Sequence, residues 1–122
     1  MTEKHALRQR GEDAAARYLE RVGTCVFERN WRCSAGTIDI LAWDGDTLVV
    51  VDVKTRASCR QEEEGQAVSA AITHRIETLA GAYIDYADLE NVTWRYDLVD
   101  LLVLSDDRAL LRHYRDALNS VV

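Results

Sequence analysis

Two aspartates stand among branched apolar residues, in segments whose composition is typical of buried strands. Asp39 lies between two isoleucines, and Asp52 lies within a run of four valines. A carboxylate in such surroundings is costly to desolvate unless a partner compensates it. Lys54 follows Asp52 by two positions, so both side chains point to the same face of a strand. These residue types at this spacing indicate a polar site built on a sheet.

Two carboxylates on one face, with a lysine beside them, can hold a hard cation. Mg²⁺ prefers oxygen ligands and usually keeps several of its waters. In phosphodiester hydrolysis such an ion activates a water and neutralises developing charge, and a nearby lysine can stabilise the transition state. Mg²⁺ or Mn²⁺ is therefore the expected cofactor. The alternative is a solvated sheet face with a cross-strand ion pair, which is common and contributes little to stability.

The register of the two strands decides whether Asp39 and Asp52 meet. Asp44 and Gly45 stand between the two apolar runs, and Asp-Gly at such a place is a strong signal for a hairpin. If these two residues form the loop, Asp52 lies diagonal to Asp39. If the loop spans 44–47, the two acids lie directly opposite each other. Both alternatives keep them on one face, and only an odd-length loop would separate them.

A third carboxylate comes from the first predicted helix. Glu12 follows Gly11 and shares a stripe with Ala15, Ala16 and Leu19 that borders the apolar face of that helix. From this border the Glu12 side chain could reach an acidic site on the sheet. A solvated helix position is the alternative for this residue.

Hydrophobic spacing predicts the elements that position these residues. Apolar residues recur at three- and four-residue steps in two segments, which is typical of amphipathic helices, and the other apolar runs read as strands. Helices are expected over 5–22 and 67–86, strands over 25–33, 38–43, 47–54, 92–104 and 109–114, and a short helical turn at the end. The order α-β-β-β-α-β-β predicts an α/β fold with a central mixed sheet, one face of which both helices cover. The polar stretch 55–66, with acidic residues at 62–64, is expected to form a loop beside the site.

The composition is typical of one globular domain. The chain has 122 residues, of which 48% are apolar and 30% charged, and it is expected to fold as a single domain over 1–122. No apolar run is long enough to span a membrane, and the first residues, which precede no apolar stretch, are not expected to be a secretory signal. Its three cysteines lack C-x-x-C spacing, and its three histidines lack ligand spacing. A cytoplasmic protein with free thiols and no membrane partner is therefore expected.

The distribution of charge bears on partners. A net charge of −6 argues against a protein that coats nucleic acid by bulk charge, although an acidic metal site would itself add negative charge. Residues 1–35 carry seven basic side chains against five acidic ones, so a polyanion would meet the N-terminal half. Arg29, Arg32 and Arg56 are the candidate phosphate contacts, because the guanidinium group matches phosphate geometry. Each could equally be an ordinary surface side chain.

An ordered set of motifs resembles a known group of nucleases. The stretch Gly36-Thr37-Ile38-Asp39-Ile40, followed by Val51-Asp52-Val53-Lys54-Thr55-Arg56, is similar to the D…(D/E)-x-K core of the PD-(D/E)xK nuclease superfamily. More closely, the chain resembles the YraN-like family of small bacterial endonuclease-like proteins, which are akin to Holliday junction resolvases. The resemblance covers most of the chain and includes the first helix at 11–19, Arg29-Asn30-Trp31-Arg32 and Arg95-Tyr96-Asp97.

The resemblance implies a restriction-endonuclease-like fold and a reaction. Asp39 and Asp52 would be metal ligands, Lys54 the catalytic lysine and Glu12 an additional acid, acting on DNA that is expected to be branched. Resolvases of this kind work as symmetric dimers, so a homodimer is the expected assembly. The family usually has glutamate in place of Thr37 and of Asp52, so this chain loses one carboxylate and shortens another. Two further functions stay open: binding of nucleic acid without cleavage, and a protein-interaction module.

Overall fold

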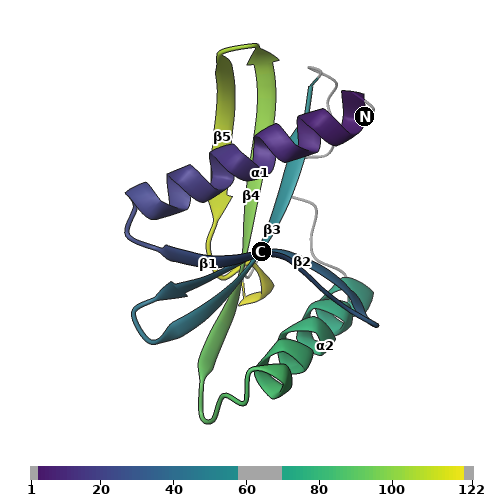
Figure 1. The fold of residues 1–122 in the computed structure, drawn as a ribbon, viewed down its shortest axis with the longest axis vertical. Coiled ribbons are helices and arrows are strands. Elements are labelled where there is room, and N and C mark those ends of the chain that lie inside the picture. The colour runs from purple at the N-terminus through teal and green to yellow at the C-terminus, as the bar shows by residue number, and fades with distance from the viewer. Residues whose placement is uncertain (1–2, 58–69, 120–122) are drawn as a thin grey trace.

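The computed structural model describes residues 3–57 and 70–119. The expected order of helices and strands is confirmed, and most bounds lie within two or three residues of those expected (Figure 1). The elements are α1 (Glu3–Arg21), β1 (Cys25–Cys33), β2 (Gly36–Asp44), β3 (Thr47–Arg56), α2 (Ala70–Tyr86), β4 (Thr93–Ser105), β5 (Arg108–Tyr114) and the short 3-10 helix η1 (Ala117–Asn119).

The first helix ends at a glycine in the left-handed region. Gly23 has a φ of 92°, a conformation that costs glycine little and other residues much more. Its amide donates to the carbonyl oxygen of Glu20 at 3.1 Å, and the amide of Thr24 donates to that of Leu19 at 2.9 Å. This pair of hydrogen bonds is a Schellman motif, and it turns the chain from α1 directly into the first strand.

The five strands form one mixed sheet in the order β1-β2-β3-β4-β5. The pairs β1–β2, β2–β3 and β4–β5 are antiparallel, whereas β3 and β4 are parallel. Parallel neighbours need a crossover connection, and α2 lies in that connection. The mixed sheet expected from the sequence is therefore confirmed, with β1 and β5 at its edges.

The β2–β3 hairpin adopts the second of the two expected registers. Asp44 pairs with Thr47, and the ladder continues regularly to the pair Ile40–Val51. The tight loop between the strands contains Gly45, whose φ is 61°. An extension of this register by one pair places Asp39 opposite Asp52, on the same side of the hairpin.

The two helices cover opposite faces of the sheet, so the expectation that both cover one face is wrong. Side chains alternate along β3: Leu48 and Val50 pack with α2, whereas Val49 and Val51 pack with α1. A strand whose consecutive residues are all buried needs cover on both faces, and α1 lies across the strands on one of them (Figure 1). The α2-side core consists of Ile38, Leu41, Leu48, Val50, Ile76, Leu79, Ala80, Tyr83 and Tyr96, and the α1-side core of Ala15, Leu19, Ile40, Ala42, Val49, Val51, Val99 and Leu101.

Three expectations concern thiols, membranes and the acidic loop. Cys25 and Cys33 are free cysteines, as expected. Neither helix, within the ranges that the structure covers, is long and apolar enough to cross a bilayer. Cys59 and the acidic residues at 62–64 lie outside the described residues.

Candidate functional site

The structure brings Asp39 and Asp52 together at the end of the β2–β3 ladder. Beyond the pair Ile40–Val51 the Asp39 carboxylate reaches over to β3, where its Oδ2 accepts a hydrogen bond of 2.9 Å from the Val53 amide. Burial raises the pKa of Asp39 to about 7, and a hydrogen bond to the Asp52 side chain and the charge of Asp52 act in the same direction. The predicted one-faced pair of acids is confirmed, although its role in metal binding stays a prediction.

Tyr96 holds the second acid of this pair. Its hydroxyl donates to Asp52 Oδ2 at 3.0 Å, and its ring lies in the α2-side core with 5% exposure. Burial, the charge of Asp52 and this hydrogen bond raise the pKa of Tyr96 well above its usual range. The parallel register pairs Tyr96 with Val50, two residues before Asp52, so the hydroxyl reaches the carboxylate along one face of the sheet. In the sequence Tyr96 belongs to the motif Arg95-Tyr96-Asp97, and nothing local to that motif indicates its contact with Asp52.

The helix α1 comes close to the acidic pair because it carries a glycine at the contact. A Cβ atom on Gly11 would overlap the side chain of Thr55 on β3. The next residue, Glu12, is 7% exposed, and its negative charge contributes to the raised pKa of Asp39. Glu12 therefore acts on Asp39 through its charge, and a direct part of Glu12 in the site stays a prediction.

Glu12 does not complete a three-residue metal group with the two aspartates. In the ranges 3–57 and 70–119, no three acidic, histidine or cysteine side chains are grouped so that they could hold a metal ion. Glu12 Oε1 instead accepts hydrogen bonds from Asn30 Nδ2 at 3.1 Å and from Arg29 at 3.3 Å. Asp39 and Asp52 fit a cation that binds through two carboxylates and keeps several waters, as Mg²⁺ usually does.

Lys54 lies on β3 two residues after Asp52 and therefore on the same face. Its side chain is exposed, which leaves the ammonium group open to a substrate. Its neighbour across the parallel β3–β4 pair is Asp100, which is ion-paired with Arg56 at 2.9 Å. Thr37, the other departure from the family pattern, is exposed on β2.

Two of the three candidate phosphate contacts are already paired inside the protein. Arg29 binds Asp13 Oδ1 at 2.7 Å and Glu12 Oε1 at 3.3 Å, and the hydrogen bond to Asp13 is the main cause that raises its pKa. Arg56 is held by Asp100. Arg32 is exposed on the edge strand β1, so its guanidinium is the most accessible of the three.

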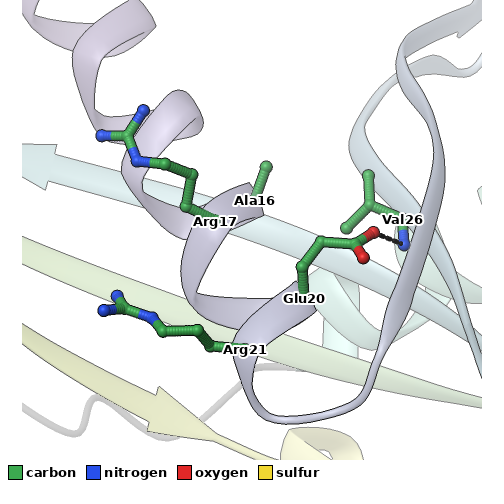
Figure 2. A pocket seen from close by; sticks show the side chains of 5 residues that line it. All are labelled: Ala16, Arg17, Glu20, Arg21 and Val26. Carbon is green, nitrogen blue, oxygen red and sulfur yellow. Dashed lines mark hydrogen bonds between the residues drawn. The ribbon is translucent and has the colours of Figure 1, made fainter.

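A hollow beside α1 presents two further basic side chains (Figure 2). Arg17 and Arg21 line it together with Ala16, Glu20 and Val26, and both guanidinium groups extend away from the contact between helix and strand (Figure 2). Glu20 links α1 to β1, because its Oε2 accepts a 2.7 Å hydrogen bond from the Val26 amide. These exposed arginines lie in the N-terminal half, which carries the basic excess, but no sequence motif distinguishes them from other surface arginines.

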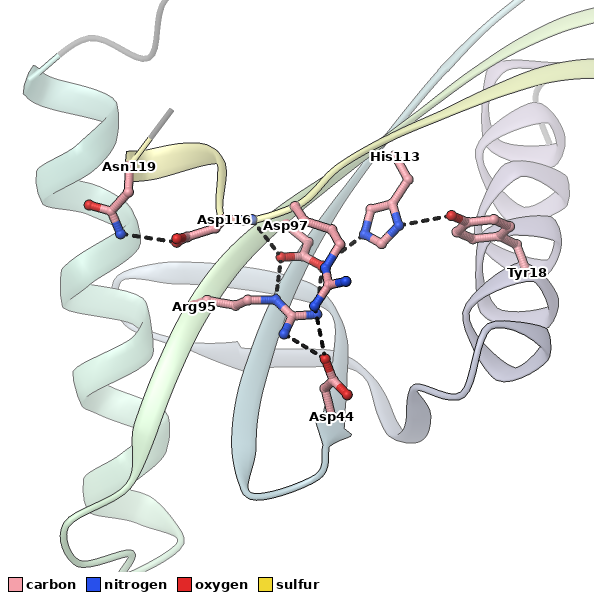
Figure 3. Close-up of polar contacts among 8 residues, drawn as sticks. Tyr18, Asp44, Arg95, Asp97, His113, Asp116 and Asn119 are labelled. Atoms are coloured by element: carbon pink, nitrogen blue, oxygen red, sulfur yellow. Dashed lines mark hydrogen bonds and ion pairs between the residues drawn. The ribbon is translucent and has the colours of Figure 1, made fainter. Parts of the chain in front are cut away.

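A second polar network lies on the α1 side of the sheet around Asp97, whose side chain is fully buried (Figure 3). Its oxygens accept hydrogen bonds from Arg95 at 2.9 Å, His113 at 2.8 Å and the Asp116 amide at 3.0 Å. Burial alone would raise the pKa of Asp97, but these hydrogen bonds outweigh it and lower that pKa. His113 also contacts the Tyr18 hydroxyl at 2.9 Å, so the network fastens α1 to β4 and β5.

Fold and site together define an α/β domain with a five-stranded mixed sheet. The acidic pair Asp39 and Asp52 lies at the end of its β2–β3 ladder. The chain belongs to the uncharacterised protein family UPF0102, whose profile matches residues 11–101 and so includes both acids of the pair. This is the family of the YraN-like proteins, so the resemblance seen in the sequence is confirmed.

Relatives in several bacterial groups match more than four fifths of the chain, and each is named simply a UPF0102 protein. A protein of Streptomyces griseus is 42% identical over 94% of this chain and 98% of its own length. One from Arthrobacter sp. is 41% identical over the same shares. A third, from Chloroflexus aurantiacus, is 41% identical over 82% of each chain. These names state no activity, so the function has to be inferred from the site.

Proposed function

We propose that this protein is a metal-dependent endonuclease that hydrolyses phosphodiester bonds of DNA, with branched DNA as its substrate. The observation that carries the proposal is the contact between Asp39 and Asp52, two carboxylates held side by side in a largely apolar sheet. Like charges at such a place repel each other, and a bound cation would relieve that repulsion. The preference for branched DNA rests on the family resemblance.

The described residues can be given roles in such a reaction. Asp39 and Asp52 would hold Mg²⁺ or Mn²⁺, which when bound supplies an activated water and neutralises charge on the phosphate. The Val53 amide and the Tyr96 hydroxyl each bind one oxygen of these carboxylates, which fixes the orientation of the pair. The exposed Lys54 would orient the attacking water or stabilise the developing negative charge.

The electrostatics of the molecule bear on how DNA would be bound. A net charge of −6 and the internal pairing of Arg29 and Arg56 leave little bulk attraction for a polyanion. Phosphates would then be contacted by accessible cations such as Arg32, with Arg17 and Arg21 on α1 as further candidates. Each phosphate that such an arginine contacts is expected to add about one to the salt slope of binding.

A cleavage panel tests the proposal. Single-stranded, duplex, flap and four-way DNA are incubated with the protein in Mg²⁺, Mn²⁺ or EDTA, and the products are resolved on a gel. Wild type should cut at least the four-way or flap substrate with metal, and Asp52→Asn should not. Asp46→Asn, the same change at an exposed residue beside the hairpin loop, is the matched control and should cut like wild type.

Three other outcomes point elsewhere. A band shift of branched DNA without cleavage under any metal condition would favour nucleic-acid binding alone. The absence of both cleavage and a shift at low salt would favour a protein-interaction module. Cleavage by Asp52→Asn equal to that of wild type would remove the acidic pair from the reaction.

A further inference from the structure

We propose that Glu12 is a positioning residue, rather than a metal ligand. Its hydrogen bond with Asn30 holds the local distortion of β1 and β2 that places the Asp39 carboxylate beside β3. The catalytic meaning of this inference rests on the proposed function. Its structural content concerns three residues on three different elements, α1, β1 and β2.

Asn30 has an unusual backbone for a residue inside a strand. Its φ is 56°, in the left-handed region that residues other than glycine seldom adopt, although asparagine tolerates it best. Among the described residues with positive φ, the other non-glycine residues, Asp88, Asn91 and Asp116, lie outside the strands. A single left-handed residue within a strand interrupts the alternation of side chains between the two faces.

The interruption is visible on both sides of Asn30. Arg29 faces α1, where it pairs with two acids of that helix, whereas Trp31 packs against the α2-side core. In a regular strand these two side chains would share a face. The partner strand changes face at the same level, because Ile40 belongs to the α1-side core and Ile38 to the α2-side core.

Asp39 is the residue at which β2 changes face. Arg29 pairs with Ile40 and Trp31 with Ile38, so Asn30 lies opposite Asp39 in the β1–β2 ladder. At the same level the regular β2–β3 pairing ends, and the Asp39 carboxylate takes the Val53 amide as its partner. The left-handed turn at Asn30 and the reach of Asp39 toward β3 are therefore two parts of one distortion.

Glu12 is the side chain that secures this distortion from outside the sheet. Its Oε1 accepts the hydrogen bond from Asn30 Nδ2 at 3.1 Å, and it is 7% exposed. Because Gly11 has no Cβ, α1 can lie close to Thr55 on β3, and Glu12 follows Gly11 directly on that helix. A carboxylate whose oxygen is engaged by Asn30 and Arg29 is suited to hold the strand in place, and the described residues contain no three-acid metal group that includes it.

The two roles for Glu12 predict different results for Glu12→Gln. Glutamine keeps an oxygen that can accept the hydrogen bond from Asn30 but loses the charge that a metal ligand needs. Glu12→Ala removes both. A positioning role therefore predicts that Glu12→Gln behaves like wild type, and a ligand role predicts that it behaves like Glu12→Ala.

Hydrogen exchange of the Val53 amide in metal-free protein reports the position of Asp39 directly, because that amide donates to Asp39 Oδ2. Glu12→Ala should exchange this amide about tenfold faster than wild type, and Glu12→Gln should stay within about threefold. The Asp116 amide, bonded to Asp97 in the second network, is the control and should not change in either variant. Unchanged Val53 exchange in Glu12→Ala would overturn the inference, and so would equal acceleration in both variants.

Asn30→Gly gives a second route to the same readout if Glu12→Ala does not fold. Glycine accepts the left-handed backbone but lacks the side-chain amide that donates to Glu12. Val53 exchange should therefore again accelerate, while Asp116 exchange is unchanged. Exchange equal to that of wild type in this variant would show that the side-chain contact does not hold the distortion, and would overturn the inference.

Calorimetric titration with Mn²⁺ separates this inference from the proposed function. Glu12→Gln should bind Mn²⁺ within about threefold of wild type, whereas Asp52→Asn should lose most of its affinity. A loss in Glu12→Gln as large as that in Asp52→Asn would make Glu12 a ligand and overturn the inference. If wild type binds no Mn²⁺, the proposed function fails, and the Val53 exchange still decides the role of Glu12.

Discussion

The Tyr96 hydroxyl donates a hydrogen bond of 3.0 Å to Asp52 Oδ2 and thereby joins the acidic pair to the α2-side core. The donor comes from β4 and the acceptor from β3, so the parallel pairing of these strands sets the orientation of the Asp52 carboxylate. A side chain that orients a metal-binding carboxylate usually affects affinity although it touches no metal.

Tyr96→Phe should therefore weaken metal binding while keeping the ring in the core. We expect a loss of roughly tenfold in Mn²⁺ affinity and of roughly 1 kcal/mol in the free energy of unfolding, because the partly buried Asp52 carboxylate loses its donor. Titration calorimetry and urea unfolding measure the two quantities. Tyr86→Phe, at a residue that is 73% exposed, is the control. Unchanged Mn²⁺ affinity in Tyr96→Phe would show that this hydrogen bond does not serve the site.

The raised pKa of Asp39 gives the metal-free protein a specific pH dependence. The pKa rises from an ordinary value of 3.8 to about 7 on folding, so between these values the folded state binds more protons than the unfolded state. This group therefore makes folding less favourable as pH rises through that window. Asp39→Asn cannot ionise and should be at least as stable as wild type at pH values above 7 in EDTA, with the difference fading toward acid pH.

Urea unfolding of both proteins in EDTA, on either side of this window, measures that difference. Asp46→Asn removes an exposed acid by the same chemical change and should show no such pH-dependent gain. An Asp39→Asn protein several kcal/mol less stable than wild type at every pH would instead make Asp39 a structural hydrogen-bonding residue. The acidic pair would then be a feature of the fold alone.

The Asp97 network should have the opposite pH dependence. Its hydrogen bonds lower the pKa of Asp97, so this group stabilises the fold above its unfolded pKa of 3.8, and the contribution is lost as pH falls through the folded pKa. Asp97→Asn leaves Arg95 and His113 without their buried partner and should cost about 3–5 kcal/mol. Urea unfolding at neutral and acid pH checks this against Asp106→Asn, an exposed control. A cost near zero would contradict the structural role.

The three candidate phosphate contacts should differ in whether their replacement affects DNA binding alone or also the stability of the protein. Arg32→Ala should weaken binding of branched DNA and reduce its salt slope by about one, without loss of stability. Arg29→Ala should also destabilise the protein, because it leaves Glu12 and Asp13 without their cation. Replacement of Arg29, Arg32 and Arg56 together should weaken binding and flatten the salt dependence. Fluorescence anisotropy at several salt concentrations measures this, and an unchanged slope would place the DNA elsewhere.

Much of the fold could be predicted because its signals are local. The end of α1 follows from the break at Gly23, and the even loop after Asp44 brings Asp39 and Asp52 to one face. The prediction that both helices cover one face of the sheet is wrong, since they cover opposite faces. The four consecutive apolar residues at 48–51 are the sequence signal for a strand covered on both faces, because a half-exposed strand would alternate apolar and polar residues.

The finer parts of the site depend on contacts between distant elements. Tyr96 meets Asp52 only through the parallel register of β3 and β4, which no single stretch of sequence specifies. The pairing of Arg29 with Asp13 likewise depends on how α1 lies against β1. The left-handed backbone of Asn30 has a weak local signal, since asparagine tolerates it, but its place opposite Asp39 emerges only from the folded sheet.

Thermal melting with and without a divalent cation tests the central claim, that Asp39 and Asp52 together hold a metal ion. Mg²⁺ or Mn²⁺ at about tenfold above its dissociation constant should stabilise wild type by roughly 1.4 kcal/mol. For a domain of this size the melting temperature should rise by roughly 3–7 °C. Asp39→Asn and Asp52→Asn should show much smaller shifts at the same ionic strength. Equal shifts in all three proteins would contradict the claim, because the metal would then bind elsewhere.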